Sequence, residues 1–174
     1  MNEPAAELSD REPFPEEDIR GMQILNAAFI AGLLMFVGVT IFLYFTAAEP
    51  KVPQGKMKQA IEHLSIANAV VFILSSAAGF FIFRSRLAPI AKACSDSPHA
   101  SPIDFLGELR GAFILRLAML EGPGLLGTVV CFLGVTGSEI HDHPIYWLNL
   151  LSPIGAITFM GVTFPTQEKL SRLF

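Results

Sequence analysis

One acidic residue stands inside a long apolar run, where an acid is costly. Glu121 lies ten residues into the apolar segment 111–135, about 15 Å from its start at 1.5 Å per residue. If that segment crosses a membrane, an ionised carboxylate there costs at least about 2.5–3.5 kcal/mol. Glu121 is therefore expected to be protonated, hydrogen-bonded or facing a wet cavity, which makes it a candidate for binding a proton or a cation.

The surroundings of Glu121 favour a packed interface between helices. Pro123 has no N–H, so the carbonyl of Met119 lacks its usual helical partner. Glycines follow at 122, 124 and 127, and small residues let a second helix approach closely. Arg116 lies about 140° away around the helix and is expected to reach the nearer membrane surface instead of pairing with Glu121. Three polar residues of other apolar segments could bond the carboxyl group: Asn149, Ser152 and Ser75.

Two readings of Glu121 stay open at this point. In the first, the carboxyl group makes a structural hydrogen bond between helices and carries no proton traffic. In the second, it is a functional proton or cation site, because intramembrane ionisable groups often mark ion pathways.

A second group of chemically capable side chains lies in the loop predicted at 136–144. Imidazole and carboxylate groups at short spacing can bind zinc or copper, and Glu139, His141 and His143 supply them here. The same residues are also what a solvated turn between helices contains. They are weak candidates, and no metal site is predicted.

The sequence lacks the usual signs of catalysis. No nucleophile, base and orienting group can be assembled at one depth, and no glycine-rich loop suits a phosphate group. None of the four histidines lies deep in an apolar run, so no haem pair is expected. We therefore expect no enzyme activity and no cofactor.

The composition points to a lipid environment. Of the 174 residues, 52% are hydrophobic and only 16% are charged, and the mean hydropathy is +0.51. A soluble domain of this size could not hide so much apolar surface. The net charge of −4, without a basic stripe, gives no reason to expect a nucleic acid partner.

Four apolar runs are long enough to cross about 30 Å of hydrocarbon. They cover residues 22–47, 61–83, 111–135 and 145–164. Because backbone groups in lipid must be paired within the chain, each run is expected to be a helix. The predicted fold is an all-α, membrane-embedded four-helix bundle.

The distribution of basic residues predicts the orientation. Of the 12 Lys and Arg residues, nine lie on the side of both termini and the middle loop 84–110, and three on the other side. The positive-inside rule then places both termini in the cytoplasm.

The chain divides into three parts. Residues 1–20 are acidic and proline-containing and are expected to be disordered. Residues 21–166 form the membrane domain, and 167–174 form a short cytoplasmic tail that can dip into the interface. Within loop 84–110, a short interfacial helix is expected over 103–110.

The stretch from Gly107 to Gly134 resembles a known helix. It reads GELRGAFILRLAMLEGPGLLGTVVCFLG, with Leu-Arg near its start, Ala-x-x-Glu in its middle and Gly-x-Val-Val after that. This is similar to the carboxylate-bearing helix of the rotor-ring proteolipid subunit of rotary ATP synthases. The resemblance implies that Glu121 matches the ion-binding carboxylate. The whole chain more closely resembles small uncharacterised bacterial four-helix membrane proteins.

These observations lead to two functional hypotheses. The first is a structural or accessory multi-pass protein of the bacterial cytoplasmic (inner) membrane, whose partners are the lipid bilayer and either further copies or a larger complex. The alternative is a proton- or cation-binding membrane protein that uses Glu121.

Overall fold

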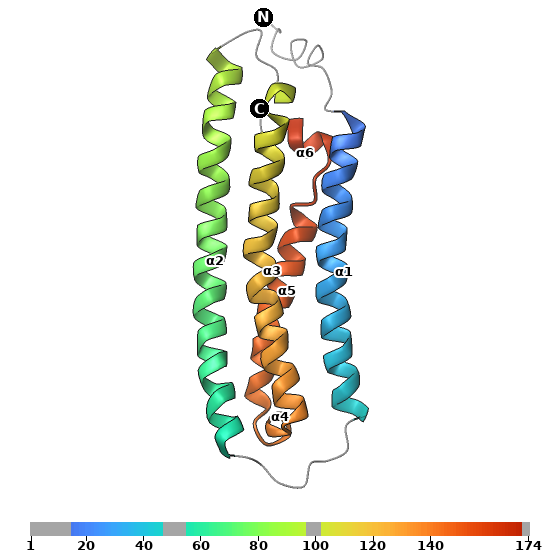
Figure 1. Ribbon diagram of the computed structural model, residues 1–174, viewed down its shortest axis with the longest axis vertical. Coiled ribbons are helices and arrows are strands. Elements are labelled where there is room, and N and C mark those ends of the chain that lie inside the picture. The colour runs from blue at the N-terminus through green and yellow to red at the C-terminus, as the bar shows by residue number, and fades with distance from the viewer. Residues whose placement is uncertain (1–14, 47–54, 97–101, 172–174) are drawn as a thin grey trace, which may run out of the picture.

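The computed structural model describes residues 15–46, 55–96 and 102–171, and every regular element among them is helical (Figure 1). In chain order these elements are α1 (Glu16–Thr46), α2 (Gly55–Asp96), the 3₁₀ helix η2 (Pro102–Phe105), α3 (Leu106–Thr136), α4 (Glu139–Asp142), the 3₁₀ helix η3 (Pro144–Leu150), α5 (Leu151–Val162) and α6 (Gln167–Ser171).

Four helical segments are long and apolar enough to cross a membrane. They are Glu16–Thr46, Met57–Ala93, Leu106–Thr136 and Pro144–Val162, and each contains one of the predicted runs in whole or in large part. The all-α fold with four potential spans is therefore confirmed. The orientation with both termini in the cytoplasm stays a prediction.

Helix α1 begins earlier than the sequence suggested. Residues 16–20, placed in the disordered segment 1–20, already form its first turn, while 1–14 lie outside the described residues. The amides of Asp18 and Ile19 donate to the carbonyl of Pro15, which starts the helix. Three acidic residues in this turn complement the positive end of the helix dipole: Glu16, Glu17 and Asp18.

The middle loop 84–110 is largely helical, which corrects the sequence-based expectation. Helix α2 continues through Pro89 to Asp96, and η2 leads directly into α3. The interfacial helix expected at 103–110 is thus the η2 turn followed by the first turn of α3. A proline inside a helix removes one backbone hydrogen bond, and the next residue, Ile90, is buried.

The fourth potential span is divided in two. It starts as the 3₁₀ helix η3 and becomes α-helical only from Leu151. Pro153 helps to explain the difference from one continuous helix, because it has no amide hydrogen to donate to the carbonyl of Asn149.

The end of α5 is tied down by side chains of its neighbours. Asn26 Nδ2 donates to the carbonyl of Met160 at 3.1 Å, and Gln23 Nε2 donates to that of Pro165 at 2.9 Å. Lys169 Nζ donates to the carbonyl of Val162 at 2.6 Å. Carbonyls at a helix end lack helical partners, so these bonds serve as caps. The tail 167–174 was predicted to dip into the interface; Leu170 of α6 is instead buried in the bundle, and Leu173 and Phe174 lie outside the described residues.

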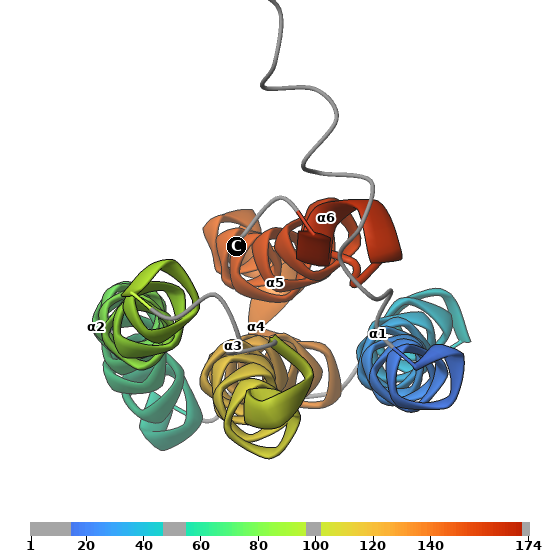
Figure 2. The same cartoon turned by 90° about the horizontal axis from the view of Figure 1, so that it is seen from above.

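Helix α3 is the centre of the bundle. Seen from above, α1 and α2 lie on opposite flanks of α3, α5 covers a third side, and the fourth side is open (Figure 2). The open side carries the exposed residues of α3 in mid-helix, Ile114, Ala118, Gly122 and Leu125.

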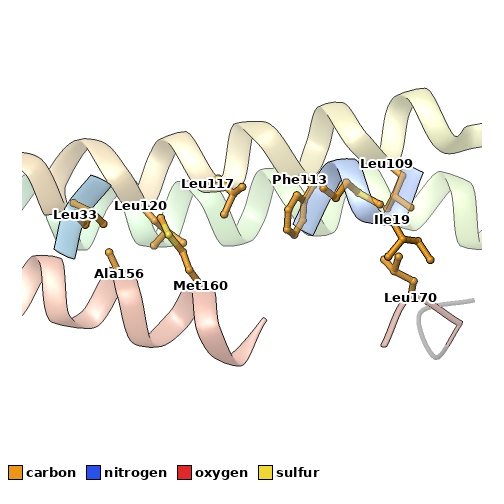
Figure 3. Packing of buried hydrophobic residues seen from close by; sticks show 10 residues of the cluster. Ile19, Leu33, Leu109, Phe113, Leu117, Leu120, Ala156, Met160 and Leu170 are labelled. Carbon is orange, nitrogen blue, oxygen red and sulfur yellow. The ribbon is translucent and has the colours of Figure 1, made fainter. Parts of the chain in front are cut away.

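Two apolar clusters hold the helices together. The larger one joins α1, α3, α5 and α6 and includes Leu33, Phe113, Leu120 and Met160 (Figure 3). The smaller one lies towards α4 and includes Ile61, Val130, Val135, Ile140 and Tyr146. Along α3, the first cluster ends at Leu120 and the second begins at Val130. The interval between them holds Gly124, Gly127 and Thr128, which are buried small or polar residues.

The contact of Leu33 with α3 can be tested by truncation. Leu33 is fully buried, and its methyl groups lie against Gly124. We expect Leu33→Ala to lower the free energy of unfolding by about 2–5 kcal/mol, because Gly124 has no side chain that could fill the cavity left behind. The matched control is Leu34→Ala, since Leu34 is 53% exposed and its loss should cost less than about 0.5 kcal/mol. Thermal unfolding of the purified protein measures both; equal effects would contradict this packing.

Candidate functional site

A buried polar layer separates the two apolar clusters. Asn68 of α2 donates from Nδ2 to Asn149 Oδ1 and to Ser152 Oγ, both at 3.2 Å. Asn149 Nδ2 in turn donates to Ser65 Oγ at 2.9 Å and to the carbonyl of Tyr146 at 2.9 Å. The layer therefore links α2 to η3 and α5 through side chains that satisfy one another.

The local sequence explains why the polar layer forms at this place. Pro153 cannot donate an amide hydrogen to the carbonyl of Asn149, and the Ser152 hydroxyl lies 2.9 Å from that carbonyl oxygen. The same hydroxyl is 3.2 Å from the carbonyl of Pro123 on α3. This approach requires Gly127, because a Cβ there would collide with Ser152 Oγ and with the backbone oxygen of Asn149.

Beside the polar layer, a groove of about 670 Å³ opens between α2 and the η3–α5 segment. Its walls are aliphatic and aromatic, and Ile66, Ile73, Leu148 and Leu151 on its rim are each at least 60% exposed. The buried residues of the polar layer, Asn68, Asn149 and Ser152, also line it. At the end near α4, the Glu62 carboxyl group is hydrogen-bonded to the Tyr146 side chain. Such a groove can bind hydrocarbon. Lipid chains can fill it as well as the side chains of a leucine-rich helix can.

Glu121 lies away from this groove. It sits midway along α3, partly exposed, at the border of the open side that carries Ala118 and Leu125. Gly127, which faces the polar layer, is turned from Glu121 by about 120° around the helix axis. No hydrogen bond or ion pair within the described residues involves Glu121.

The three predicted supporting residues are not gathered around Glu121. The Ser152 hydroxyl donates to the backbone carbonyl of Asn149, and both residues accept hydrogen bonds from Asn68. Ser75 is partly buried on α2 and has no hydrogen bond to Glu121 within the described part of the chain. The structure therefore assembles two of the four candidate residues into the polar layer and leaves the acid outside it.

Arg116 differs from its predicted position. Its guanidinium group lies between the rings of Phe83 and Phe159, with centroids 4.4 and 4.5 Å from Cζ. It is half-buried between α2 and α5, so it does not extend freely to the membrane surface.

The weak metal candidates near α4 point to separate partners. Glu139 is buried, His141 stacks on Tyr44 with centroids 4.6 Å apart, and His143 meets Tyr146 edge-on at 5.9 Å. Among the described residues, no three His, Cys, Asp or Glu side chains are grouped to hold a metal ion.

Comparison with known proteins assigns no family to this fold: no family model, no curated protein and no solved structure matches the chain.

Sequence reasoning missed Asn68 and the groove. Asn68 is a lone amide in the apolar run 61–83, and nothing in its spacing indicates which residue it contacts. Its depth matches that of Asn149, but depth alone does not say which faces meet. The one usable signal was the pair Ser152-Pro153, since a proline after a hydroxyl residue leaves a carbonyl that the hydroxyl can satisfy.

The polar layer depends on the missing side chain at position 127. We expect Gly127→Ala to lower the free energy of unfolding by about 1–3 kcal/mol, because the new methyl group collides with the backbone at Asn149 and with Ser152. Gly122→Ala is the matched control: it is on the same helix, and no atom lies within 4 Å of its Cβ position. That variant should be at least as stable as wild type, since alanine favours helix. Denaturation in detergent compares the two, and an unchanged Gly127→Ala midpoint would refute the contact.

Proposed function

We propose that the chain is a non-catalytic, multi-pass protein of the bacterial cytoplasmic membrane, with both termini inside. It serves as a structural or accessory component that packs against a second copy of itself through the open side of α3. The single observation that carries this proposal is the position of Glu121, in the middle of α3 and without a hydrogen-bond or ion-pair partner among the described residues.

Hydrocarbon offers Glu121 no hydrogen bond. The groups around it on the open side are apolar: Ala118, Gly122 and Leu125. A polar group left unpaired in lipid is costly. A hydrogen-bond donor supplied from outside the chain therefore stabilises the contact more than it would in water. In a two-fold contact the same patch of each copy meets the other, which brings two Glu121 carboxyl groups together. A protonated carboxyl group of one copy then donates to the other.

The shape of the open side supports a helix–helix contact. Gly111 and Gly122 expose their backbone, with no atom within 4 Å of either Cβ position, and Ala118 between them is also small. Small residues at such spacing allow two helices to approach closely in a membrane. The uncovered side of α3 is the one seen in Figure 2 facing away from α5.

The alternative, a proton- or cation-binding role for Glu121, is favoured by the same partial exposure. A carboxyl group that none of the described residues bonds is able to take up a proton or a small cation. Glu121→Gln separates the two functions, because the amide keeps a hydrogen bond between copies but can neither ionise nor bind a cation by charge. Loss of a pH- or ion-dependent signal in Glu121→Gln, with association kept, would favour the alternative.

The packing proposal is tested by association in lipid vesicles, measured as energy transfer between labelled copies. We expect Glu121→Leu to weaken association by about 1–2 kcal/mol, which is the scale of an interhelical hydrogen bond, and Glu121→Gln to weaken it less. Gly122→Leu should abolish close approach. Gly38→Leu is the control, since Gly38 is an equally open glycine of α1. Association unchanged in both Glu121→Leu and Gly122→Leu would rule out this surface.

A further inference from the structure

A second, smaller hollow lies between α2, α3 and α5, on a different side of α3 from Glu121. Its volume is about 120 Å³, and its lining includes Ser76 and Phe80 of α2, Arg116 of α3 and Phe159 of α5. Two polar atoms there are buried and have no hydrogen-bond partner in the part of the chain that the structure describes, Arg116 Nε and Ser76 Oγ. Two unused donors from different helices thus line one small space.

The guanidinium group of Arg116 is held on its faces and left unpaired at its edge. The rings of Phe83 and Phe159 lie 4.4 and 4.5 Å from Cζ, which fits cation–π contact on the group. Such contacts fix the plane but use none of the five N–H donors. No ion pair or hydrogen bond of Arg116 occurs within the described residues. A permanent charge without a counter-charge in a membrane span is costly, so it is expected to find an anion.

The chemistry of the hollow selects a negative ligand with an apolar body. No carboxylate lines it, and besides Arg116 and Ser76 its lining side chains are apolar, among them Phe72 and Leu120. Its volume corresponds to about four water molecules, enough for a carboxylate or for the oxygens of one phosphate. The planar fork of arginine fits both groups through paired hydrogen bonds.

We propose that this hollow binds the anionic oxygen group of an amphiphile, with Arg116 donating to it through the guanidinium edge and Ser76 donating through its hydroxyl. The hydrocarbon part of the ligand then lies along the α2–α5 side, whose larger groove shares Phe72 with the hollow. The anionic group is either the phosphate of an acidic lipid or the carboxylate of a fatty acid. This site is separate from the proposed association through Glu121. A negative result for one of the two proposals therefore does not contradict the other.

The test uses the full chain reconstituted in vesicles of phosphatidylcholine that contain a minor share of either phosphatidylglycerol or oleic acid. Native mass spectrometry after mild extraction counts the lipids that stay bound. We expect enrichment of the acidic species over phosphatidylcholine, and a drop of about tenfold or more in Arg116→Gln, the scale of a lost charged hydrogen bond. Arg86→Gln is the control for general charge, because Arg86 is an exposed arginine of α2.

Further variants keep the proposal falsifiable if Arg116→Gln does not fold. Arg116→Lys should bind partly, since it keeps the charge but loses the fork, and Ser76→Ala should bind a few-fold more weakly. Enrichment of phosphatidylglycerol alone identifies a phosphate, and enrichment of oleate alone identifies a carboxylate. No enrichment of either in the wild type, or equal losses in the Arg116 and Arg86 variants, would overturn the proposal.

Discussion

The contact at Gly127 is the one on which the rest of the bundle depends. There the backbone of α3 meets the turn between η3 and α5 closely enough that the Ser152 hydroxyl can reach the carbonyls of both Pro123 and Asn149. Lipid supplies no hydrogen bonds, so every backbone group freed by a proline must be served from within the protein. Pro153 frees such a group, and the Ser152 hydroxyl serves it. Asn68 then ties α2 to the same point and fixes its height against α3 and α5.

Polar groups in this protein fall into two kinds that differ in how they are satisfied. Those in the polar layer bond one another across three helices and need nothing from outside. Glu121 and Arg116 each carry an ionisable group in the middle of the apolar helices, and neither finds an opposite charge among the described residues. Because they lie on different sides of α3, they cannot neutralise each other. The polar layer thus stabilises the fold, whereas Glu121 and Arg116 mark the surfaces for which a binding partner is proposed.

Most of the fold could be predicted from the sequence, because a run of about 20 apolar residues directly indicates a helix that is long enough to cross a bilayer. The residues at which the helices begin and end were harder to predict. The second apolar run was predicted to end at residue 83, but α2 continues through Pro89 to Asp96, and Ile90 in this extension is buried. The candidate site was only partly foreseen. Asn149 and Ser152 were picked as polar residues at the right depth, while their true partner, Asn68, depends on how α2 is rotated about its axis. Rotation is set by many side-chain contacts at once, which no single spacing encodes.

The length of α2 has a consequence of its own. Its 42 residues extend about 63 Å, roughly twice the hydrocarbon thickness of a bilayer. Arg84, Arg86 and Lys92 are exposed on its final third, which therefore carries basic side chains on the part of the helix that exceeds the length of one span. Asn68, which bonds Asn149 and Ser152, lies on this same helix. The exposed basic end and the buried amide layer are therefore joined by one continuous helix.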